Sequence, residues 1–511
     1  MHPFLFPSVL SAVAVVALAE TPSNEDDIPF FGCALLGAYY PPPTIDISSK
    51  PIQGVVSEFT KMFDELVQNG GSDKYGSINV NTTSFSVVIF GGDEKLRDDP
   101  IFFQYHYTSP EDQVSNENIT LATRFPVGDV TMVFTVYAWL AKMGEQWETP
   151  ITKYLPELAD VKSPYAPSWK DITIGALAGQ MSGLSRESTA CVVGEPCDWE
   201  SFQETFATKS PYFLPDTTPV VSYAAWQLLV FAMERESGSD WTSILEDTLL
   251  KPLNLTSSGV LSHDCKDIFA MESLNRTWCI VISIGRRWLK SHADTSNLRN
   301  GVGRPWEVYR AGQNIRPIMD ALTKAGTLGK YASYFGLTTD FNAGFAILAH
   351  DSSVEDRKLD LNVHADIVSE VIGYFSQIAA AETEARYAGQ YGNGENSMAF
   401  LNTTRDGHGI AVQKLVIDGV NIKDRTAQKL GIKPNDLDFR VYPTNVKDEN
   451  QHQFVAVFQD RSALIDMGTP TCISWQEVGA DAEIFVRFIM RAGKAVGIDI
   501  PQWNSEMVRT D

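Results

Sequence analysis

Residues 125–143, FPVGDVTMVFTVYAWLAKM, combine a glycine-containing turn with an apolar helical pattern. Gly128 and Asp129 mark the start of the predicted helix. After them, apolar side chains recur at three- and four-residue spacing, at Met132, Val133, Val136, Tyr137, Leu140 and Ala141. This spacing predicts a helix over residues 130–143 with a face buried in the core.

Strand and helix patterns alternate on both sides of this helix. Runs rich in β-branched and aromatic residues predict strands at 85–90 and 101–107, and a later hairpin with strands at 331–337 and 345–349. Periodic apolar positions with end signals predict helices at 174–180, 224–237, 241–250 and 367–378. The order of strands, helices, strands and a final helix is typical of an α/β sandwich.

The pattern of apolar and turn-forming residues changes from about Tyr387. Short apolar runs separated by Gly, Asn and Asp follow, at 409–412, 439–442 and 454–458. We expect one domain over residues 20–385 and a second, mainly β domain over residues 386–511, a size usual for a domain.

The order of motifs along the chain resembles class C β-lactamases, low-molecular-weight penicillin-binding proteins and related esterases. Residues 125–135 resemble the segment that carries their Ser-x-x-Lys motif, and further matches are ITKYLPE at 151–157, DITI at 171–174, MSGL at 181–184 and residues 224–255. The resemblance covers roughly residues 30–380. It implies a β-lactamase/transpeptidase-like sandwich, in which helices and a helical subdomain flank an antiparallel sheet, followed here by the mainly β domain.

The Ser-x-x-Lys motif is changed at both chemical positions. In the family, a serine nucleophile at the helix start gives its proton to a lysine on the same helix face. The resemblance places Asp129 at the serine position and Met132 at the lysine position. A carboxylate is a poor attacker on esters or amides, and a thioether cannot accept a proton. We therefore expect no standard acyl-enzyme chemistry here.

Two interpretations of Asp129 stay open. It could be the N-cap of the helix, which would contribute about 1 kcal/mol, with Met132 as a core residue. Alternatively, a desolvated Asp129 could act as a general acid or base in the same pocket.

The second motif of the family, Tyr-x-Asn, corresponds to Tyr223-Ala224-Ala225. The resemblance implies that Tyr223 shuttles protons, while the asparagine that holds the substrate amide is replaced by Ala225. The alternative is a packed tyrosine with a bonded hydroxyl group.

The third motif, Lys-Thr-Gly, corresponds to Lys324-Ala325-Gly326. The resemblance implies that Gly326 lets a substrate lie against the strand and that Lys324 attracts an anionic group. The alternative for Lys324 is a solvated lysine before a strand.

Other candidate residues have weaker support. Thr131 and Ser182 are the nearby hydroxyl groups that could replace the serine, but neither has an evident base. Gly407-His408-Gly409 fits the His-x-Gly variant of the third motif, but it follows the last helix of the first domain. We therefore interpret it as a turn.

The N-terminus and several residue types predict a secretory protein. Residues 1–19 form an apolar run that ends in Ala17-Leu18-Ala19, which predicts a signal peptide; a membrane anchor is the alternative. Possible N-glycosylation sequons begin at Asn81, Asn118, Asn254, Asn275 and Asn402. Six cysteines agree with disulfides. Local pairing would join Cys191 to Cys197 and Cys265 to Cys279 and leave Cys33 with Cys472, but the sequence cannot choose among the connectivities.

Composition and charge exclude several partners. A formal net charge of -23 argues against nucleic acid, which is held by clustered Lys and Arg. After residue 19 no apolar run is long enough to span a membrane. No Cys or His cluster suggests zinc, and we expect no metal or other cofactor.

We therefore expect a secreted β-lactamase-like protein that binds or rearranges a small acyl compound. The segments FGCALLG at 31–37 and GRPWEVYR at 303–310 resemble a secreted fungal branch, whose members often serve in natural-product pathways. One alternative is an active hydrolase or transacylase with a displaced nucleophile. Another is a glycoprotein kept for interaction alone.

Overall fold

The computed structural model describes residues 39–92, 100–115, 118–186, 198–255, 258–259, 287–297, 299–311, 319–354, 359–404, 406–462 and 484–511. They form two compact units. The first contains the described parts of residues 42–311 and 318–378, and the second contains those of residues 379–511 together with residues 39–41. No helix among the described residues has the length and apolar character needed to cross a membrane.

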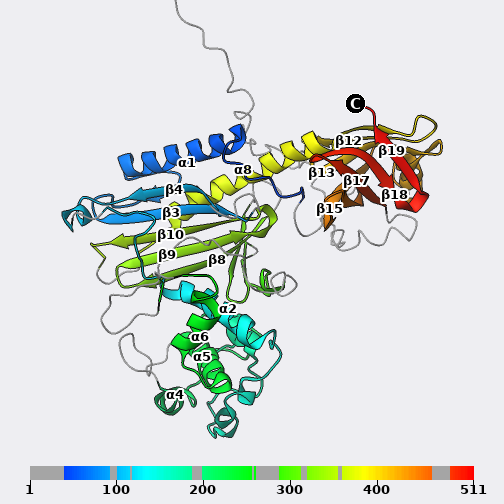
Figure 1. Ribbon diagram of the computed structural model, residues 1–511. Helices are drawn as coiled ribbons and strands as arrows, with labels where there is room; N and C mark the ends of the chain where they lie inside the picture. Colours follow the sequence, from blue (N-terminus) through cyan, green and yellow to red (C-terminus); the bar gives the residue numbers. More distant parts are fainter. Residues whose placement is uncertain are drawn as a thin grey trace, which may run out of the picture. The chain divides into compact units, whose positions relative to one another are not determined.

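An eight-stranded antiparallel sheet is the centre of the first unit (Figure 1). Its spatial order is β4-β3-β10-β9-β8-β7-β6-β5. The strands are β3 (Thr83–Gly91), β4 (Ile101–Tyr107), β5 (Ala293–Asp294), β6 (Asn300–Val302), β7 (Glu307–Ala311), β8 (Met319–Leu328), β9 (Tyr331–Thr338) and β10 (Ala343–Asp351). A small ribbon of β1 (Gly71–Ser72) and β2 (Gly76–Ser77) lies apart from this sheet.

Two long helices cover one face of the sheet (Figure 1). They are α1 (Lys50–Asn69) and the first part of α8 (Asn362–Tyr387). In α1 the buried residues recur at three- and four-residue spacing, at Ile52, Val55, Phe59, Phe63 and Leu66, and Gly70 ends the helix in the left-handed conformation. The odd-numbered residues of β3 from 85 to 89 pack on the same side. The helical stripe predicted at 367–378 lies within α8.

A helical subdomain packs against the opposite face. It contains α2 (Thr131–Met143), α3 (Ile174–Ala178), α4 (Trp199–Phe206), α5 (Tyr223–Ser237) and α6 (Trp241–Leu245), which continues as a π-helical turn over Glu246–Leu250. Because successive side chains of a strand point to opposite faces, Val88 and Phe90 of β3 join this second apolar cluster.

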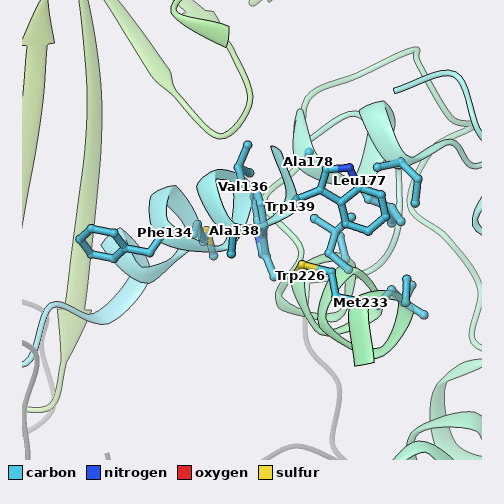
Figure 2. Packing of buried hydrophobic residues seen from close by; sticks show 14 of the residues in the cluster. Phe134, Val136, Ala138, Trp139, Leu177, Ala178, Trp226 and Met233 are labelled. Atoms are coloured by element: carbon cyan, nitrogen blue, oxygen red, sulfur yellow. The ribbon is translucent and has the colours of Figure 1, made fainter. Parts of the chain in front are cut away.

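Helix α2 is buried on nearly all sides. All its residues from Met132 to Leu140 are buried. Figure 2 shows Trp139 of α2 among Leu177 and Ala178 of α3 and Trp226 and Met233 of α5. Burying a large apolar side chain contributes about 1.5–3 kcal/mol, so this packing fixes the position of α2 firmly.

The second unit is mainly β. Its strands are β11 (Gly389–Gly392), β12 (Met398–Thr404), β13 (Gly407–Ile417), β14 (Val420–Asn421), β15 (Leu437–Lys447), β16 (Gln451–Asp460), β17 (Phe485–Arg491), β18 (Lys494–Ile500) and β19 (Ser505–Arg509), with one helix, α9 (Ile422–Leu430). The order is β12-β11-β19-β18-β17-β16-β15-β13-β14, and β12 also pairs with β13. That pairing closes the sheet into a ring around an apolar interior.

The predicted fold class is confirmed: an antiparallel sheet between helices and a helical subdomain, followed by a mainly-strand region. The hairpin predicted at 331–349 is confirmed, since β9 and β10 pair antiparallel. Strand β8, which precedes β9 and pairs with it, extends this hairpin into a longer meander. One detail of the prediction was wrong. The helix expected at 241–250 keeps α-helical form only to Leu245.

Candidate functional site

The turn that leads into α2 is pressed against strand β8. Gly128 begins a 3-10 turn, Gly128–Val130, with a φ angle of 51°. A Cβ atom on Gly128 would lie 2.7 Å from the backbone N and O atoms of Thr327. Both the left-handed backbone and the close strand therefore require glycine at this position.

Gly326 makes room for the same turn from the side of β8. A Cβ atom there would lie 2.3 Å from the carbonyl oxygen of Val127 and 2.7 Å from the backbone nitrogen of Asp129. Ser333 of β9 adds a buried hydrogen bond, since its Oγ donates to the Val127 carbonyl at 2.6 Å. The third sequence motif and the start of α2 are thus in direct contact.

Asp129 and Tyr223 meet in this region. Tyr223 is the first residue of α5, whose N-cap Ser222 accepts a hydrogen bond from the Ala225 backbone and donates one to the Ser185 carbonyl. The Tyr223 hydroxyl group donates to Oδ2 of Asp129 at 3.3 Å. Asp129 is half-buried and Tyr223 is 37% exposed. The first two motifs therefore place a carboxylate and a phenol within hydrogen-bond reach.

The interpretation of Asp129 as the N-cap of α2 was wrong. The N-cap residue of α2 is Val130, and Asp129 lies inside the preceding 3-10 turn. The turn forms because Gly128 adopts a left-handed conformation beside β8, which moves the helix start by one residue.

Lys324 lies inside β8 and is almost fully buried, so the interpretation as a solvated lysine before a strand was wrong. Its side chain is 1% exposed, and its Nζ donates to Oε1 of Glu307 at 2.5 Å. Oε2 of Glu307 accepts a hydrogen bond from the Ala325 backbone at 3.3 Å. Glu307 itself, on β7, is 39% exposed. The cation expected to attract an anionic group is thus already paired with a carboxylate.

Sequence reasoning missed Glu307. It lies in the segment GRPWEVYR, which was matched only as a family resemblance. A charged residue between Trp306 and Val308, both buried, is a usable signal, because charges are rare in buried strands unless paired.

The other candidate positions are apolar or inaccessible. Met132 and Ala225 are both buried in the apolar cluster around α2 and α5. Ser182 is buried, and its Oγ accepts a hydrogen bond from Leu184. Thr131 is half-buried at the first position of α2. Of the two candidate replacement hydroxyls, Thr131 is therefore the more accessible.

The triplet Gly407-His408-Gly409 is not a turn, as the sequence suggested, but the beginning of β13. It belongs to the second unit, whereas the residues around Asp129 belong to the first.

Several predicted features lie outside the described residues. These are residues 1–19, Asn275 and all six cysteines, Cys33, Cys191, Cys197, Cys265, Cys279 and Cys472. Of the other sequon residues, Asn81, Asn118 and Asn254 are exposed, whereas Asn402 is half-buried in β12. Within the described part of the chain, no group of three His, Cys, Asp or Glu residues is arranged to hold a metal ion.

Comparison with known proteins gives matches to both parts of the chain. A family model described as "Beta-lactamase" matches residues 97–266, and one described as "Beta-lactamase-like-like, C-terminal domain" matches residues 379–511. A β-lactamase-like protein of Arthroderma benhamiae is 24% identical, over 94% of this chain and 96% of the relative. The "Probable hydrolase M10" of Phoma sp. is 20% identical, over 82% and 80% of the two chains.

Among solved structures, a penicillin-binding-protein homologue from Pyrococcus abyssi aligns with a TM-score of 0.48 and 12% identity. The alignment covers 89% of this chain and all of that one. The matches to the two family models and to the Arthroderma relative extend over both units, and the motifs occur in the order expected for the family. The two family models and the Arthroderma relative therefore support a β-lactamase and penicillin-binding-protein-like family for this chain.

Proposed function

We propose that this chain binds a small acyl compound without forming an acyl-enzyme at the start of α2, and that Asp129 and Tyr223 exchange protons with that compound. The observation that carries the proposal is the hydrogen bond from the Tyr223 hydroxyl group to Asp129 Oδ2. It joins a proton donor and a proton acceptor at the position where the family has its nucleophile and its proton shuttle.

The two substituted positions support this function. A carboxylate at position 129 accepts protons but attacks acyl carbons poorly. Met132 is buried and carries no group that could take a proton. The contacts of Gly326 and Ser333 with this segment are to backbone atoms of Val127 and Asp129, so they do not depend on the side chains at positions 129 and 132. The proposed role therefore needs no residue beyond those in place.

The test is intact-mass detection of a covalent adduct after incubation with a fluorophosphonate and with benzylpenicillin. The expected result is no adduct on the natural protein and an adduct on the Asp129→Ser, Met132→Lys double variant. The Asp129→Ser single variant, which lacks a proton acceptor at position 132, is the matched control and should be labelled more slowly. An adduct on the natural protein at the site would overturn the proposal.

The names of the relatives favour a second candidate, an active hydrolase or transacylase with a displaced nucleophile. Two relatives are named probable hydrolases. Thr131 is the candidate hydroxyl, because it begins α2 and is half-buried rather than buried. Peptide mapping of an adduct to Thr131, and its loss in Thr131→Val, would establish this function in place of the first.

We also propose that the chain enters the secretory pathway and carries N-linked glycans. The apolar run at residues 1–19 and the exposure of Asn81, Asn118 and Asn254 support this. Mass measurement of the secreted form before and after enzymatic deglycosylation tests both points. A start at residue 20 and a loss of glycan mass are expected, and an unprocessed, unmodified chain would contradict them.

A further inference from the structure

The electrostatic character of the site follows from three ionisable side chains around β8. Successive residues of a strand point to opposite faces, so Lys324 and Gly326 share one face. Gly326 abuts the backbone of Asp129. The Cα atom of Lys324 therefore lies about 7 Å along β8 from the contact between Gly326 and Asp129, at roughly 3.3 Å per residue. Lys324, its partner Glu307 and Asp129 thus belong to one neighbourhood.

Two of these side chains are carboxylates and one is an ammonium group. The positive charge is not available to a ligand without rearrangement, because Lys324 is 1% exposed and its Nζ is 2.5 Å from Glu307 Oε1. Of the two partners, the one in contact with solvent is the carboxylate, since Glu307 is 39% exposed. Within this ion pair, Glu307 is therefore the partner whose charged group a ligand in solvent can contact directly.

A second contact holds Glu307 in place. Its other oxygen, Oε2, accepts the hydrogen bond from the Ala325 backbone at 3.3 Å. A ligand carboxylate that sought Lys324 would have to displace a charge-assisted hydrogen bond and a backbone contact together. The carboxylate of Asp129, whose backbone adjoins Gly326, adds a second negative charge to this region that disfavours an anionic ligand.

We infer that the site selects neutral or cationic acyl compounds and excludes those that carry a carboxylate, and that Glu307 is the residue that sets this preference. The inference rests on the proposed function, since it concerns the ligand of the same site. It reverses the expectation from the sequence that Lys324 holds an anionic group.

Three matched probes test the inference with the full-length protein. They are 4-fluorophenylacetylglycine, which is anionic, its primary amide, which is neutral, and N-(4-fluorophenylacetyl)ethylenediamine, which is cationic. Dissociation constants are measured by fluorine NMR titration. On the natural protein, the anion should bind at least about tenfold more weakly than the amide, and the cation at least as tightly as the amide.

Two variants at the ion pair assign the effect to Glu307. In Glu307→Gln the freed charge of Lys324 should improve binding of the anion by about tenfold and weaken binding of the cation. In the double variant Glu307→Gln, Lys324→Gln no cation is released, so the anion should not gain this affinity. Asp129→Asn gives an independent measurement that leaves the buried pair intact, and it should weaken the cation by about threefold or more.

The inference is overturned if the natural protein binds the anion as tightly as the amide, or if none of the probes binds any of these proteins. It is also overturned if folded Glu307→Gln keeps the natural ranking. If Glu307→Gln does not fold, an unchanged ranking in Asp129→Asn overturns it instead. A covalent adduct on the natural protein would refute the proposed acid/base function, while the ranking of the three dissociation constants would still test the role of Glu307.

Discussion

Two glycine triplets in this chain fit the same family pattern, yet their surroundings differ. In Lys324-Ala325-Gly326, the glycine makes room for the backbone of Val127 and Asp129. In Gly407-His408-Gly409, Gly407 faces the guanidinium group of Arg440, and Gly409, with a φ angle of 77°, faces the ring of Tyr442. The first triplet positions a helix start, and the second accommodates a large cation and an aromatic ring.

Each triplet also lies beside a buried cation, and the two cations are neutralised differently. Lys324 pairs with Glu307, which is partly exposed. Arg440 pairs with Asp438, which is nearly buried, and with Asp406, and Arg461 contacts both of these carboxylates. The comparison shows that a short motif does not by itself reveal its structural role. The role depends on which neighbouring atoms occupy the space beside the glycine.

The largest expected difference between the two regions is the cost of removing each cation. Arg440→Ala leaves the buried Asp438 carboxylate beside a cavity with Arg461 as its remaining cationic partner, so we expect a loss of about 3–5 kcal/mol in unfolding free energy. Lys324→Ala leaves Glu307, which can turn toward water, and should cost about 1–3 kcal/mol. Urea denaturation followed by circular dichroism measures both. Equal losses would show that the counter-ions' exposure does not matter.

Substituting alanine for one glycine of each triplet tests whether the two triplets have different structural roles. Gly326→Ala and Gly409→Ala should each lose about 1–3 kcal/mol because the new atom overlaps neighbouring atoms. Only Gly326→Ala should also abolish binding of the neutral fluorinated amide. The control is Gly493→Ala, which has a similar φ angle of 76° but open space around the new atom, and should cost about 1 kcal/mol. Unchanged amide binding in Gly326→Ala would disconnect this triplet from the site.

The ion network beside the second triplet predicts a pH dependence. Partial burial alone would raise the pKa of Asp406, but hydrogen bonding with Arg461 and the charges of Arg461 and Arg440 outweigh burial and hold that pKa well below its usual range. The unfolded chain therefore takes up this proton first as the pH falls. The stabilisation is complete above the unfolded pKa of about 3.9 and is lost as the pH falls toward the folded value.

Urea titrations at pH 7, 5 and 3 test this dependence. The natural protein should lose stability between pH 5 and 3 more steeply than Asp406→Asn, which has no carboxylate to protonate at this position. Identical slopes would show that Asp406 contributes nothing to the acid sensitivity of the second unit.

The smallest expected effect concerns the hydrogen bond that links β9 to the turn before α2. Ser333→Ala removes the bond to the Val127 carbonyl and should cost about 1 kcal/mol. It should also weaken amide binding a few-fold. Thr338→Val is the control, since Thr338 makes a buried hydrogen bond to Ala343 at the far end of the same strand. If both variants weaken binding equally, the effect is general loosening of β9.

Local patterns were sufficient to predict the main elements. The spacing of apolar residues predicted α2 and the apolar stripe of α8, and runs of β-branched and aromatic residues predicted β3, β4 and β9. These signals could be read because they depend only on neighbours in sequence. Local patterns did not predict strand β8, MDALTKAGTL, although the family resemblance implied a strand at Gly326, since the polar residues of β8 are accommodated by partners from other elements. Its Lys324 is the clearest case, as it is buried only because Glu307 on β7 neutralises it.

The candidate site was predicted only in part, because some of its features depend on contacts between residues that are distant in sequence. The motifs singled out Asp129, Tyr223 and Gly326, which the structure brings together. The 3-10 turn at Asp129 was not foreseen, because it depends on contact between Gly128 and a strand almost two hundred positions later. The role of Glu307 was not foreseen either, because an ion pair between neighbouring strands produces no periodic pattern in the sequence.

The ring of strands in the second unit has a consequence for synthesis on the ribosome. β19 pairs with both β18 and β11, so the ring cannot close until residue 509 has emerged, although β11 and β12 were made much earlier. At 5–20 residues per second, β11 waits on the order of ten seconds with its edge toward β19 unpaired, whereas β12 soon has both of its neighbours, β11 and β13. Exposed edges recruit other chains. Chaperone demand during translation should therefore be concentrated on β11, residues 389–392.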